Sequence, residues 1–341
     1  MCIFTKDFIS MSKRDKFLIT GFSGFVSKHF IDFLENNKMS AEVLGVDINE
    51  DIPFDYANYE FVTCSFEKID LLNKVSVENV ISKFQPNYVL HLASYSSVAL
   101  SWKLPVESFT NNTNIFLNLI ETIRLSQINC RILSIGSSEE YGNVLDGNIH
   151  LAEEHVLNPI SPYAVARVSQ EMLSKVYTDS YGMDIIMTRS FNHIGTHQKD
   201  IFVIPSFVKK MIALKENKDI IKELTTGDTS IVRDFVDVRA VVEAYYLLFK
   251  KGKKGELYNI CNEKGTSLNE VIQVISSILK IKVVQKVDAN LVRPNDNKII
   301  IGSNKKIKKD TGWVNKYTLE DSLKDIVAYY QQNVKSLRFK A

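Results

Sequence analysis

Short apolar segments alternate with longer amphipathic segments through the first half of the chain. The apolar segments lie at residues 16–20, 42–47, 60–64, 88–93, 130–136 and 184–190. Between them, apolar side chains recur at helical spacing in residues 74–84, 107–125 and 163–181. Apolar strands that alternate with amphipathic helices are typical of a parallel sheet covered on both faces. The pattern therefore predicts an α/β fold built on a Rossmann-like, doubly wound parallel sheet.

From about residue 193 the pattern becomes less regular. Helices are expected near 205–216, 238–250, 267–280 and 319–333, with short strands between them. We interpret this part as a smaller, mixed α/β lobe that closes over the carboxyl edge of the sheet. The predicted organisation is an N-terminal tail (1–14), a dinucleotide-binding domain with the catalytic residues (15–192) and a lobe that mainly binds substrate (193–341).

Composition narrows the classes of function. The chain has 341 residues, 45% of them apolar and 24% charged, with a net charge of +2. This is ordinary for a globular protein with a sizeable core. The lysine runs at 250–254 and 305–309 are short and lack interleaved aromatic residues, so no nucleic-acid partner is expected. No apolar run approaches the length of a membrane span, and the N-terminus does not resemble a signal peptide.

The cysteines and histidines do not indicate a metal site. Cys2, Cys64, Cys130 and Cys261 lie far apart and form no C-x-x-C pair, which fits a reducing cytoplasm rather than a disulfide framework. The six histidines show no spacing typical of metal ligands. We therefore expect a cytoplasmic protein without a bound metal.

A glycine turn follows the first predicted strand. In the segment TGFSGFVS, Gly21 and Gly24 stand where a phosphate-binding turn bends tightly and approaches a pyrophosphate. The helix that follows would present its N-terminus to the negative charge. Ser27 occupies the position that usually carries a third glycine, and it is small enough to replace it. The context of strand, turn and helix predicts a dinucleotide site.

Asp47 ends the second predicted strand. A carboxylate at this place hydrogen-bonds the adenosine ribose and repels a 2′-phosphate, which favours NAD over NADP. The alternative is that Asp47 only forms a turn.

Two further segments carry candidate chemistry. The segment SIGSSEEYG follows the fifth predicted strand, and SPYAVAR begins the next long helix. Ligands bind beyond the carboxyl ends of parallel strands, which places Ser137, Ser138 and Glu139 at the site. Tyr163 and Arg167 are four residues apart, so they share one helix face.

In these motifs the chain resembles the extended short-chain dehydrogenases/reductases of the NAD-dependent epimerase/dehydratase family. The resemblance covers about residues 15–333 and rests on the segments TGFSGFVS, HLAS, GSSEEYG, SPYAVAR, RSFNHIG, VRDFVDV and RPND. Within that family it is most similar to the GDP-4-keto-6-deoxy-D-mannose reductases, followed by the GDP-mannose 4,6-dehydratases. Several motifs in the expected order are more specific than any one of them.

The resemblance assigns roles to the catalytic segment. It implies that Tyr163 is the general acid/base and that Ser137 orients the substrate oxygen. Arg167 stands where the family has a lysine that promotes ionisation of the tyrosine and holds the nicotinamide ribose. Glu139 matches a glutamate of the dehydratases, but the reductases also have a glutamate here, so it does not decide the reaction.

The resemblance also implies ligand contacts and an assembly. NAD(H), favoured over NADP(H), would contact a group of residues in the sheet half, and a nucleotide-diphosphate sugar would contact a second group; a homodimer is expected. The cofactor group is Gly21, Ser23, Gly24, Phe25, Asp47, Leu92, Ala93, Asn112, Tyr163 and Arg167, and the substrate group is Ser138, Asn192, Arg233 and Arg293. Asn112 is explained almost as well as a polar residue at a helix N-terminus.

Four positions depart from the family pattern: Ser27, Ile115, Thr196 and Arg167. The last is the most serious, because it lies in the catalytic segment. Arginine is permanently charged, so it can promote ionisation of a nearby tyrosine, but it cannot release a proton to a relay. We expect activity that is retained but reduced or altered.

The leading hypothesis is an NAD(P)H-dependent reductase of a nucleotide-linked 4-keto-6-deoxyhexose in surface polysaccharide biosynthesis. One alternative is a 4,6-dehydratase or 4-epimerase that keeps its NAD tightly bound. A second alternative is a homologue that binds nucleotide without catalysis.

Overall fold

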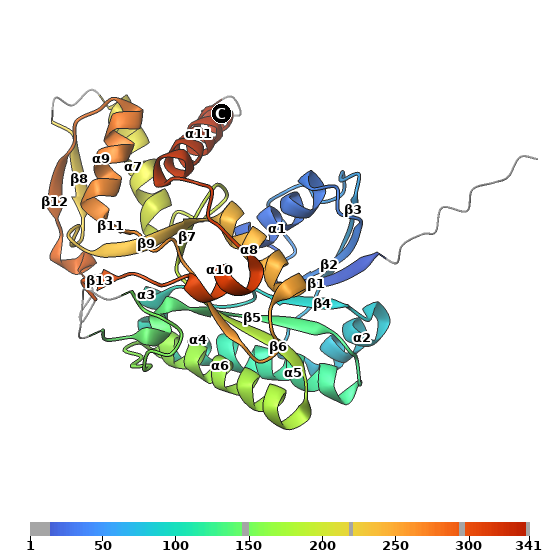
Figure 1. Ribbon diagram of the computed structural model, residues 1–341. Coiled ribbons are helices and arrows are strands. Elements are labelled where there is room, and N and C mark those ends of the chain that lie inside the picture. The colour runs from blue at the N-terminus through green and yellow to red at the C-terminus, as the bar shows by residue number, and fades with distance from the viewer. Residues whose placement is uncertain (1–13, 145–149, 218–220, 293–296, 339–341) are drawn as a thin grey trace, which may run out of the picture.

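A parallel sheet of seven strands forms the centre of the larger part of the molecule (Figure 1). The computed structural model describes residues 14–144, 150–217, 221–292 and 297–338. Every neighbouring pair in this sheet is parallel, and the strand order is β10-β6-β5-β4-β1-β2-β3. The strands are β1 (Asp15–Thr20), β2 (Ala41–Asp47), β3 (Val62–Lys68), β4 (Tyr88–His91), β5 (Arg131–Ser137), β6 (Asp184–Ser190) and β10 (Leu257–Ile260).

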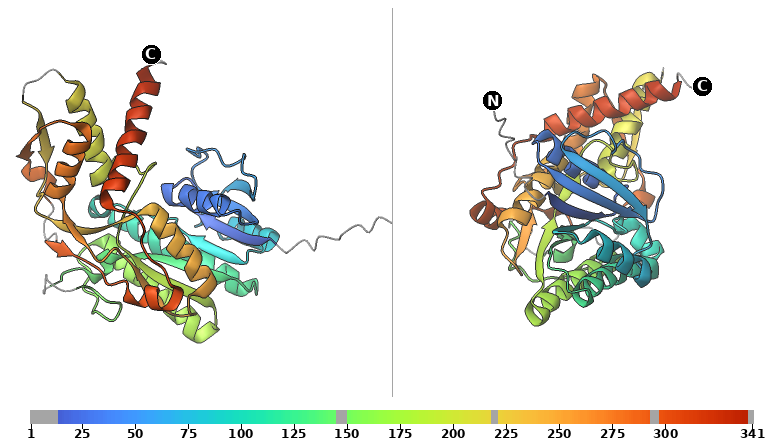
Figure 2. Two further views of the ribbon diagram at one scale, coloured as in Figure 1. Left: turned by 45° about the horizontal axis from the view of Figure 1, so that its top comes forward. Right: turned by 90° about the vertical axis from the view of Figure 1, so that its right-hand side faces the viewer.

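Helices cover both faces of this sheet (Figure 2). One face packs in a common core with α1 (Phe25–Asn36) and α8 (Val238–Lys251). The other packs with α2 (Lys74–Phe84), α5 (Ile115–Leu125) and α6 (Pro162–Tyr181). The predicted Rossmann-like, doubly wound fold is therefore confirmed, and the apolar character of the strands follows from burial on both sides.

The strand order changes direction between β1 and β4. Strands β4, β5 and β6 extend from β1 in one direction, and β2 and β3 extend in the other. Ligands of open α/β sheets bind beyond the carboxyl ends of the strands at such a switch in order. The carboxyl ends of β1 and β4 are therefore the place to look for a nucleotide site.

A second region carries smaller sheets and its own apolar core. One sheet joins four strands, a second pairs two, and three helices pack beside them (Figure 1). The strands are β7 (Asn192–Ile194), β9 (Val232–Asp237), β11 (Gly265–Ser267) and β13 (Ile299–Ile300) in the first sheet, and β8 (Glu223–Thr226) and β12 (Val284–Val287) in the second; the helices are α7 (Val203–Glu216), α9 (Leu268–Leu279) and α11 (Leu319–Arg338).

The chain passes between the two regions more than once. After β9, helix α8 returns to the large sheet, and β10 adds that sheet's outermost strand beside β6. Helix α10 (Lys305–Thr311) also packs against α8 and β10. A single boundary at residue 193 therefore does not describe the architecture. The substrate-binding role of residues 193–341 stays a prediction.

The stretch expected as one helix at 107–125 is divided. Helix α4 (Pro105–Phe109) is followed by a π-helical turn, η1 (Thr110–Asn114), before α5 begins. The side-chain amide of Asn112 donates to the Ser108 carbonyl, 2.6 Å away, and thus takes up an acceptor of the preceding turn. Local π-helical turns often occur at functional sites.

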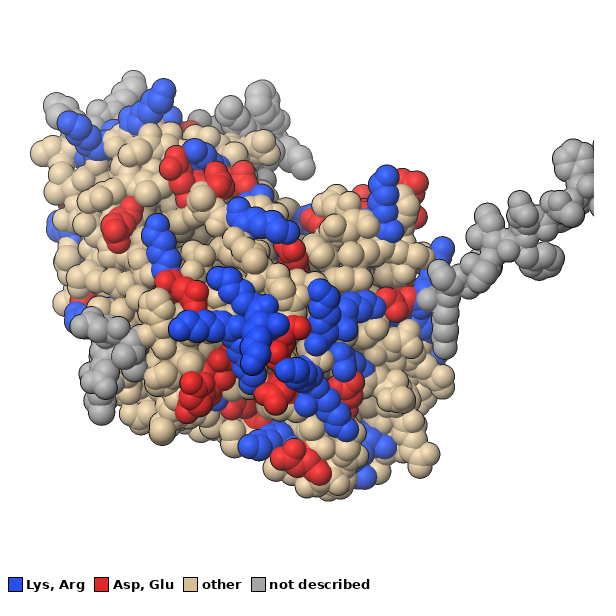
Figure 3. Space-filling model, in the orientation of Figure 1, with Lys and Arg blue, Asp and Glu red and all other residues tan. Residues whose placement is uncertain are grey.

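The surface around α8 and α10 carries many lysines (Figure 3). Acidic side chains lie among them, and several ion pairs are formed there. Examples are Lys250 with Asp15, Lys253 with Asp310 and Lys306 with Glu256. Much of the positive charge on this face is therefore balanced locally.

Candidate active site

The glycine turn lies against the end of β4, at the switch in strand order. Gly21 has a φ of +70°, and a Cβ atom there would lie 2.7 Å from the backbone nitrogen of Ala93. Leu92 and Ala93 are tied to Thr20, because their backbone nitrogens donate to its carbonyl and its hydroxyl oxygen. Only glycine fits both the left-handed backbone and this close approach. We call this turn the glycine cradle; its tight bend is the one expected of a phosphate-binding turn.

Ser27 shows why a serine is tolerated at the third glycine position. It is fully buried, and its hydroxyl donates to the carbonyls of Phe22 and Gly24, the latter at 2.7 Å. The side chain therefore turns back onto its own loop. Gly24 precedes the first residue of α1, Phe25, so the helix N-terminus faces the cradle.

Asp47 is bound to the same turn. One of its carboxylate oxygens accepts from the backbone nitrogen of Ser23 at 2.9 Å and from its hydroxyl at 2.8 Å. The other accepts from the backbone nitrogen of Asn49 at 3.0 Å. Asp47 therefore organises two turns, as the alternative reading expected, and it also sets a negative charge beside the glycine cradle.

At the end of β5, three of the predicted residues follow one another. Ser137 is the last strand residue, and Ser138 and Glu139 begin the short 3₁₀ helix η2 (Ser138–Tyr141). The Ser137 hydroxyl accepts from the backbone nitrogen of Glu139 at 3.2 Å, and its own backbone nitrogen donates to the Glu140 carboxylate at 2.6 Å. This reciprocal capping fixes the turn that carries all three side chains.

Helix α6 brings the tyrosine and the arginine to that turn. Ser161 caps the helix, with its hydroxyl accepting from the Ala164 nitrogen at 3.1 Å, and Pro162 occupies the first turn. Tyr163 and Arg167 are 6% and 5% exposed, and the Nε of Arg167 donates to the Tyr163 hydroxyl at 3.3 Å. The structure therefore pairs the two residues that the sequence placed on one helix face.

Two neutral acceptors hold the Nη1 of the Arg167 guanidinium. Its Nη1 donates to the Ile135 carbonyl at 3.0 Å and to the side-chain oxygen of Gln170 at 2.6 Å. Within the described ranges, Arg167 has no ion pair with a carboxylate. Its charge is felt nearby: burial first, and then the Arg167 charge, lower the pKa of His91 to about 3.

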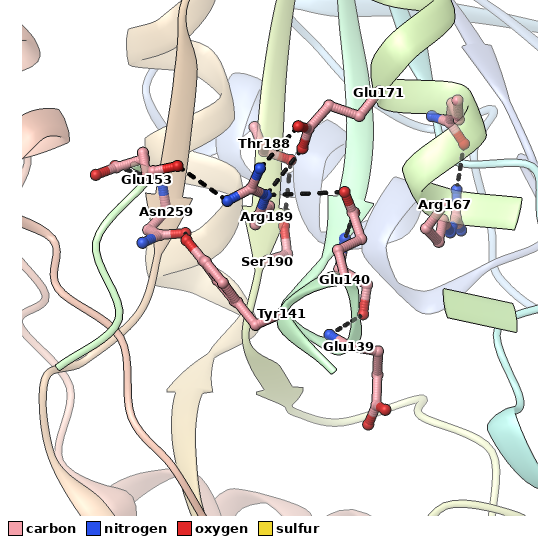
Figure 4. A network of polar contacts seen from close by, with 12 residues as sticks. Glu139, Glu140, Tyr141, Glu153, Arg167, Glu171, Thr188, Arg189, Ser190 and Asn259 are labelled. Atoms are coloured by element: carbon pink, nitrogen blue, oxygen red, sulfur yellow. Dashed lines mark hydrogen bonds and ion pairs between the residues drawn. The ribbon is translucent and has the colours of Figure 1, made fainter. Parts of the chain in front are cut away.

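A second buried arginine lies close by in a different setting (Figure 4). Arg189 on β6 donates to both oxygens of Glu171 at 2.8 and 2.7 Å, and Glu140 lies 3.8 Å from its Nε. Burial, followed by the charge of Glu171, raises the pKa of Glu140 well above its usual range. In Figure 4 the carboxylate of Glu139 points away from this group.

The π-helical turn places Asn112 in the interior. Its amide nitrogen donates to the Ser108 carbonyl and, at 3.3 Å, to the Tyr95 carbonyl. Its fully buried oxygen accepts no hydrogen bond from the residues that the structure describes. The neighbouring Thr113 donates to the Ala166 carbonyl of α6 at 3.1 Å. The turn is thus fixed to the helix that carries Tyr163 and Arg167.

The residues predicted to bind the nucleotide diphosphate lie in the second region or beyond the described part of the chain. Asn192 begins β7 and is exposed. Arg233 on β9 is 8% exposed, and its Nη1 donates to the carbonyls of Val232 and Asn297 at 2.9 and 2.8 Å. Arg293 lies outside the described residues. The Nη1 of Arg233 is therefore anchored by backbone carbonyls.

Sequence reasoning overlooked Gln170, Ser134 and Ser174. Gln170 and Ser174 follow Tyr163 by seven and eleven residues, a spacing that repeats on one helix face, so the signal was present. Ser134 interrupts an otherwise apolar strand. The buried acids around Arg189 carried no local signal, because their partners come from three separate elements.

The expectations that the protein has no bound metal and no membrane span can be compared with the described residues. Among these, no three histidine, cysteine or acidic side chains cluster so as to hold a metal ion. None of the described helices combines the length and the apolar character that a bilayer crossing requires.

Comparison with known proteins decides the family. The family model of GDP-mannose 4,6-dehydratase matches residues 18–326. The chain belongs to this family. It is thus an NAD(P)-dependent enzyme of the short-chain dehydrogenase/reductase type that acts on nucleotide sugars, as the motifs indicated.

Individual relatives do not agree on one reaction. GDP-6-deoxy-D-mannose reductase of Pseudomonas aeruginosa is 28% identical over 94% of this chain and 98% of its own length. The structure of RMD from the same organism, complexed with NADPH, has a TM-score of 0.80 at 27% identity, over 94% and 98% of the two chains. UDP-glucose 4-epimerase of Thermotoga maritima, solved with UDP-glucose, reaches a TM-score of 0.81 at 27% identity, over 94% and 99%.

Proposed function

We propose that this protein is a reductase of a nucleotide-linked 4-keto-6-deoxyhexose that contributes to surface polysaccharide biosynthesis. The observation that carries the proposal is the buried Tyr163–Arg167 pair, which lies beside the turn of Ser137 at the carboxyl edge of the sheet. The similarity to a GDP-6-deoxy-D-mannose reductase, at 28% identity over nearly the full length of both chains, supports reduction.

Each residue of the pair then has a defined task. A reduced nicotinamide bound beside Tyr163 and Arg167 would supply the hydride to the keto carbon and be oxidised. Tyr163 donates its phenolic proton to the former carbonyl oxygen, which becomes the alcohol, and Ser137 holds that oxygen by a hydrogen bond. Arg167 stabilises the phenolate left on Tyr163, because an adjacent cation favours the charged form. Glu139 belongs to the same turn, with its backbone nitrogen bound to the Ser137 hydroxyl.

We further propose that NADH is favoured over NADPH. The cradle at Gly21 fits a pyrophosphate, and the carboxylate of Asp47 lies beside it, where it would repel a 2′-phosphate. The nearby Lys68 is paired with Glu50 and thus offers less to an additional phosphate. A competitive titration tests this, and a strong preference for NADPH, the cofactor held by the related RMD, would overturn it.

The substrate contacts and the assembly complete the proposal. Asn192, Arg233 and Arg293 would hold the nucleotide diphosphate, since guanidinium groups match phosphate oxygens, and Ser138 would contact another part of the substrate. A homodimer is supported by an apolar face on three helices that pack together, α3 (Val98–Lys103), α4 and α6. Exposed on it are Trp102, Val106, Phe109, Val165, Met172 and Val176. Analytical ultracentrifugation of Met172→Glu would test this assembly.

A second candidate is a 4,6-dehydratase or 4-epimerase with tightly bound NAD. It is supported by the match to the family model of GDP-mannose 4,6-dehydratase and by the similarity to UDP-glucose 4-epimerase. Such an enzyme returns the hydride to its substrate and shows no net consumption of cofactor.

The test is incubation with GDP-4-keto-6-deoxymannose and each reduced cofactor, with the product identified by NMR. We expect stoichiometric oxidation of NADH and loss of the ketone signal, and neither with Tyr163→Phe. Turnover of a nucleotide hexose without net oxidation would select the second candidate. Binding of nucleotide without any product would select a non-catalytic homologue.

A further inference from the structure

The Arg167 guanidinium is fixed by contacts on one side. Its Nη1 is bound twice, to the Ile135 carbonyl at 3.0 Å and to the Gln170 side-chain oxygen at 2.6 Å. Since a guanidinium is planar, these bonds set the direction of its other nitrogens. Nε reaches Tyr163 at 3.3 Å, and Nη2 makes no hydrogen bond to any residue that the structure describes.

Gln170 is itself held at both ends of its amide. It is 1% exposed, and its nitrogen donates to the Ser134 hydroxyl at 2.9 Å and to the Ile135 carbonyl at 3.1 Å. Ser134 in turn lies 3.0 Å from the hydroxyl of Ser174. A flipped amide would face Arg167 with donors and the Ile135 carbonyl with an acceptor, so only one orientation is satisfied.

We propose that Gln170 is a positioning residue that adapts this site to an arginine in place of a lysine. It acts through Arg167: it aims Nε at the Tyr163 hydroxyl and keeps Nη2, which no described residue binds, available to a ligand. Gln170 is also neutral, so it accepts a hydrogen bond without cancelling the charge. The proposal rests on the proposed function insofar as Tyr163 is the proton donor.

An arginine needs this support more than a lysine does. A lysine ammonium is a compact charge with rotatable donors, and it can meet the tyrosine without a fixed plane. When a guanidinium rotates about its side chain, a different nitrogen comes to face the phenol. Loss of Gln170 should therefore lower turnover strongly in the protein with Arg167 and much less in Arg167→Lys.

A double-mutant cycle tests this on the full chain, with wild type, Gln170→Ala, Arg167→Lys and the double variant. For each we would measure kcat for reduction of the 4-keto sugar nucleotide, the NADH dissociation constant by nicotinamide fluorescence, and the urea unfolding midpoint. We expect Gln170→Ala to lower kcat about tenfold or more with Arg167 and less than about threefold with lysine, within the range for coupled neighbours. The shift in unfolding midpoint should be similar in both backgrounds.

Two further variants sharpen the result. Gln170→Glu keeps the acceptor but adds a negative charge, so NADH binding should hold while kcat falls. Ser174→Ala removes the far end of the chain of hydrogen bonds and should have a smaller effect than Gln170→Ala. A merely structural glutamine would give the same loss of kcat and NADH affinity in both backgrounds, which would overturn the proposal.

Failure of the proposed function would look different. If none of the proteins reduces a 4-keto sugar nucleotide, the reaction is wrong, but NADH binding still tests the positioning role. In that case Gln170→Ala should weaken NADH binding with Arg167 and leave it nearly unchanged with lysine. Equal weakening in both backgrounds would contradict the positioning role independently of the reaction.

Discussion

Two buried arginines in this protein have opposite surroundings. Arg167 on α6 and Arg189 on β6 are 5% and 3% exposed. Arg189 is held by the carboxylate of Glu171 and lies 3.8 Å from Glu140, whereas Arg167 is held by a carbonyl, an amide and a phenol. Figure 4 shows Arg167 apart from the acids grouped around Arg189.

The difference indicates a structural role for the charge of Arg189 and a role in the chemistry for the charge of Arg167. The charge of Arg189 is neutralised where it lies, and its bonds join β6 to α6 and to the turn after β5. The charge of Arg167 has no carboxylate partner among the described residues, so it acts on the titratable groups beside it. Burying an unpaired charge disfavours folding, and such an arrangement is common at functional sites.

The largest effect should come from removing the structural charge. Arg189→Met leaves Glu171 and Glu140 buried together without their cation. We expect a loss of about 3–5 kcal/mol in the free energy of unfolding, measured with urea, as for other broken buried ion pairs. Arg167→Met is the matched control and should lose clearly less, because its partners are neutral. Equal losses would remove the distinction between the two sites.

The next effect concerns activity. Arg167→Met removes the cation beside Tyr163 and the guanidinium donor that no described residue binds. We expect turnover to fall by about a hundredfold or more, the scale of a lost general acid/base contribution, with weaker NADH binding. Steady-state kinetics and fluorescence titration on protein with a normal unfolding midpoint would check this. Unchanged turnover would show that the charge of Arg167 has no part in the reaction.

The third effect is a pH dependence of stability. The pKa of Glu140 is raised in the folded protein, so the folded state holds a proton that the unfolded state releases. Stability should therefore fall as pH rises from the ordinary glutamate range toward the raised pKa, by up to about 1.4 kcal/mol per pH unit. Glu140→Gln, which imitates the protonated acid, should flatten this slope. The exposed Glu320→Gln should not, and an unchanged slope in Glu140→Gln would contradict the assignment.

The smallest effect is expected for Arg167→Lys. The charge remains, and a lysine can meet both the phenol and a ribose hydroxyl. We expect turnover within about tenfold of the wild type, higher or lower, and a shifted pH optimum, since arginine and lysine differ in reach and hydration. Complete pH–rate profiles of both proteins provide the measurement. Loss of all turnover would show that the guanidinium plane itself is required.

Much of the fold could be predicted from the sequence. The apolar segments at 184–190 and 42–47 coincide closely with β6 and β2, because strands buried on both faces leave a continuous apolar run. The return of α8 and β10 to the large sheet could not be predicted. Which sheet a strand joins depends on contacts distant in sequence, such as Leu257 beside Met187.

The site could be predicted only in its local parts. Gly21, Ser137 and Tyr163 belong to short motifs, and the structure brings their turns to one edge of the sheet. The neutral surroundings of Arg167 depend on Ile135, thirty-two residues away, and on an amide orientation that no motif encodes. The sequence raised the question of the arginine, and the contacts of its guanidinium offer an answer.

The most direct measurement is the single-turnover rate of 4-keto sugar reduction at saturating NADH, where cofactor binding no longer limits the rate. If the charge of Arg167 acts on proton donation by Tyr163, this rate should fall about a hundredfold or more in Arg167→Met and stay within about tenfold of the wild type in Arg167→Lys. Equal rates in wild type and Arg167→Met would contradict the role given to the arginine.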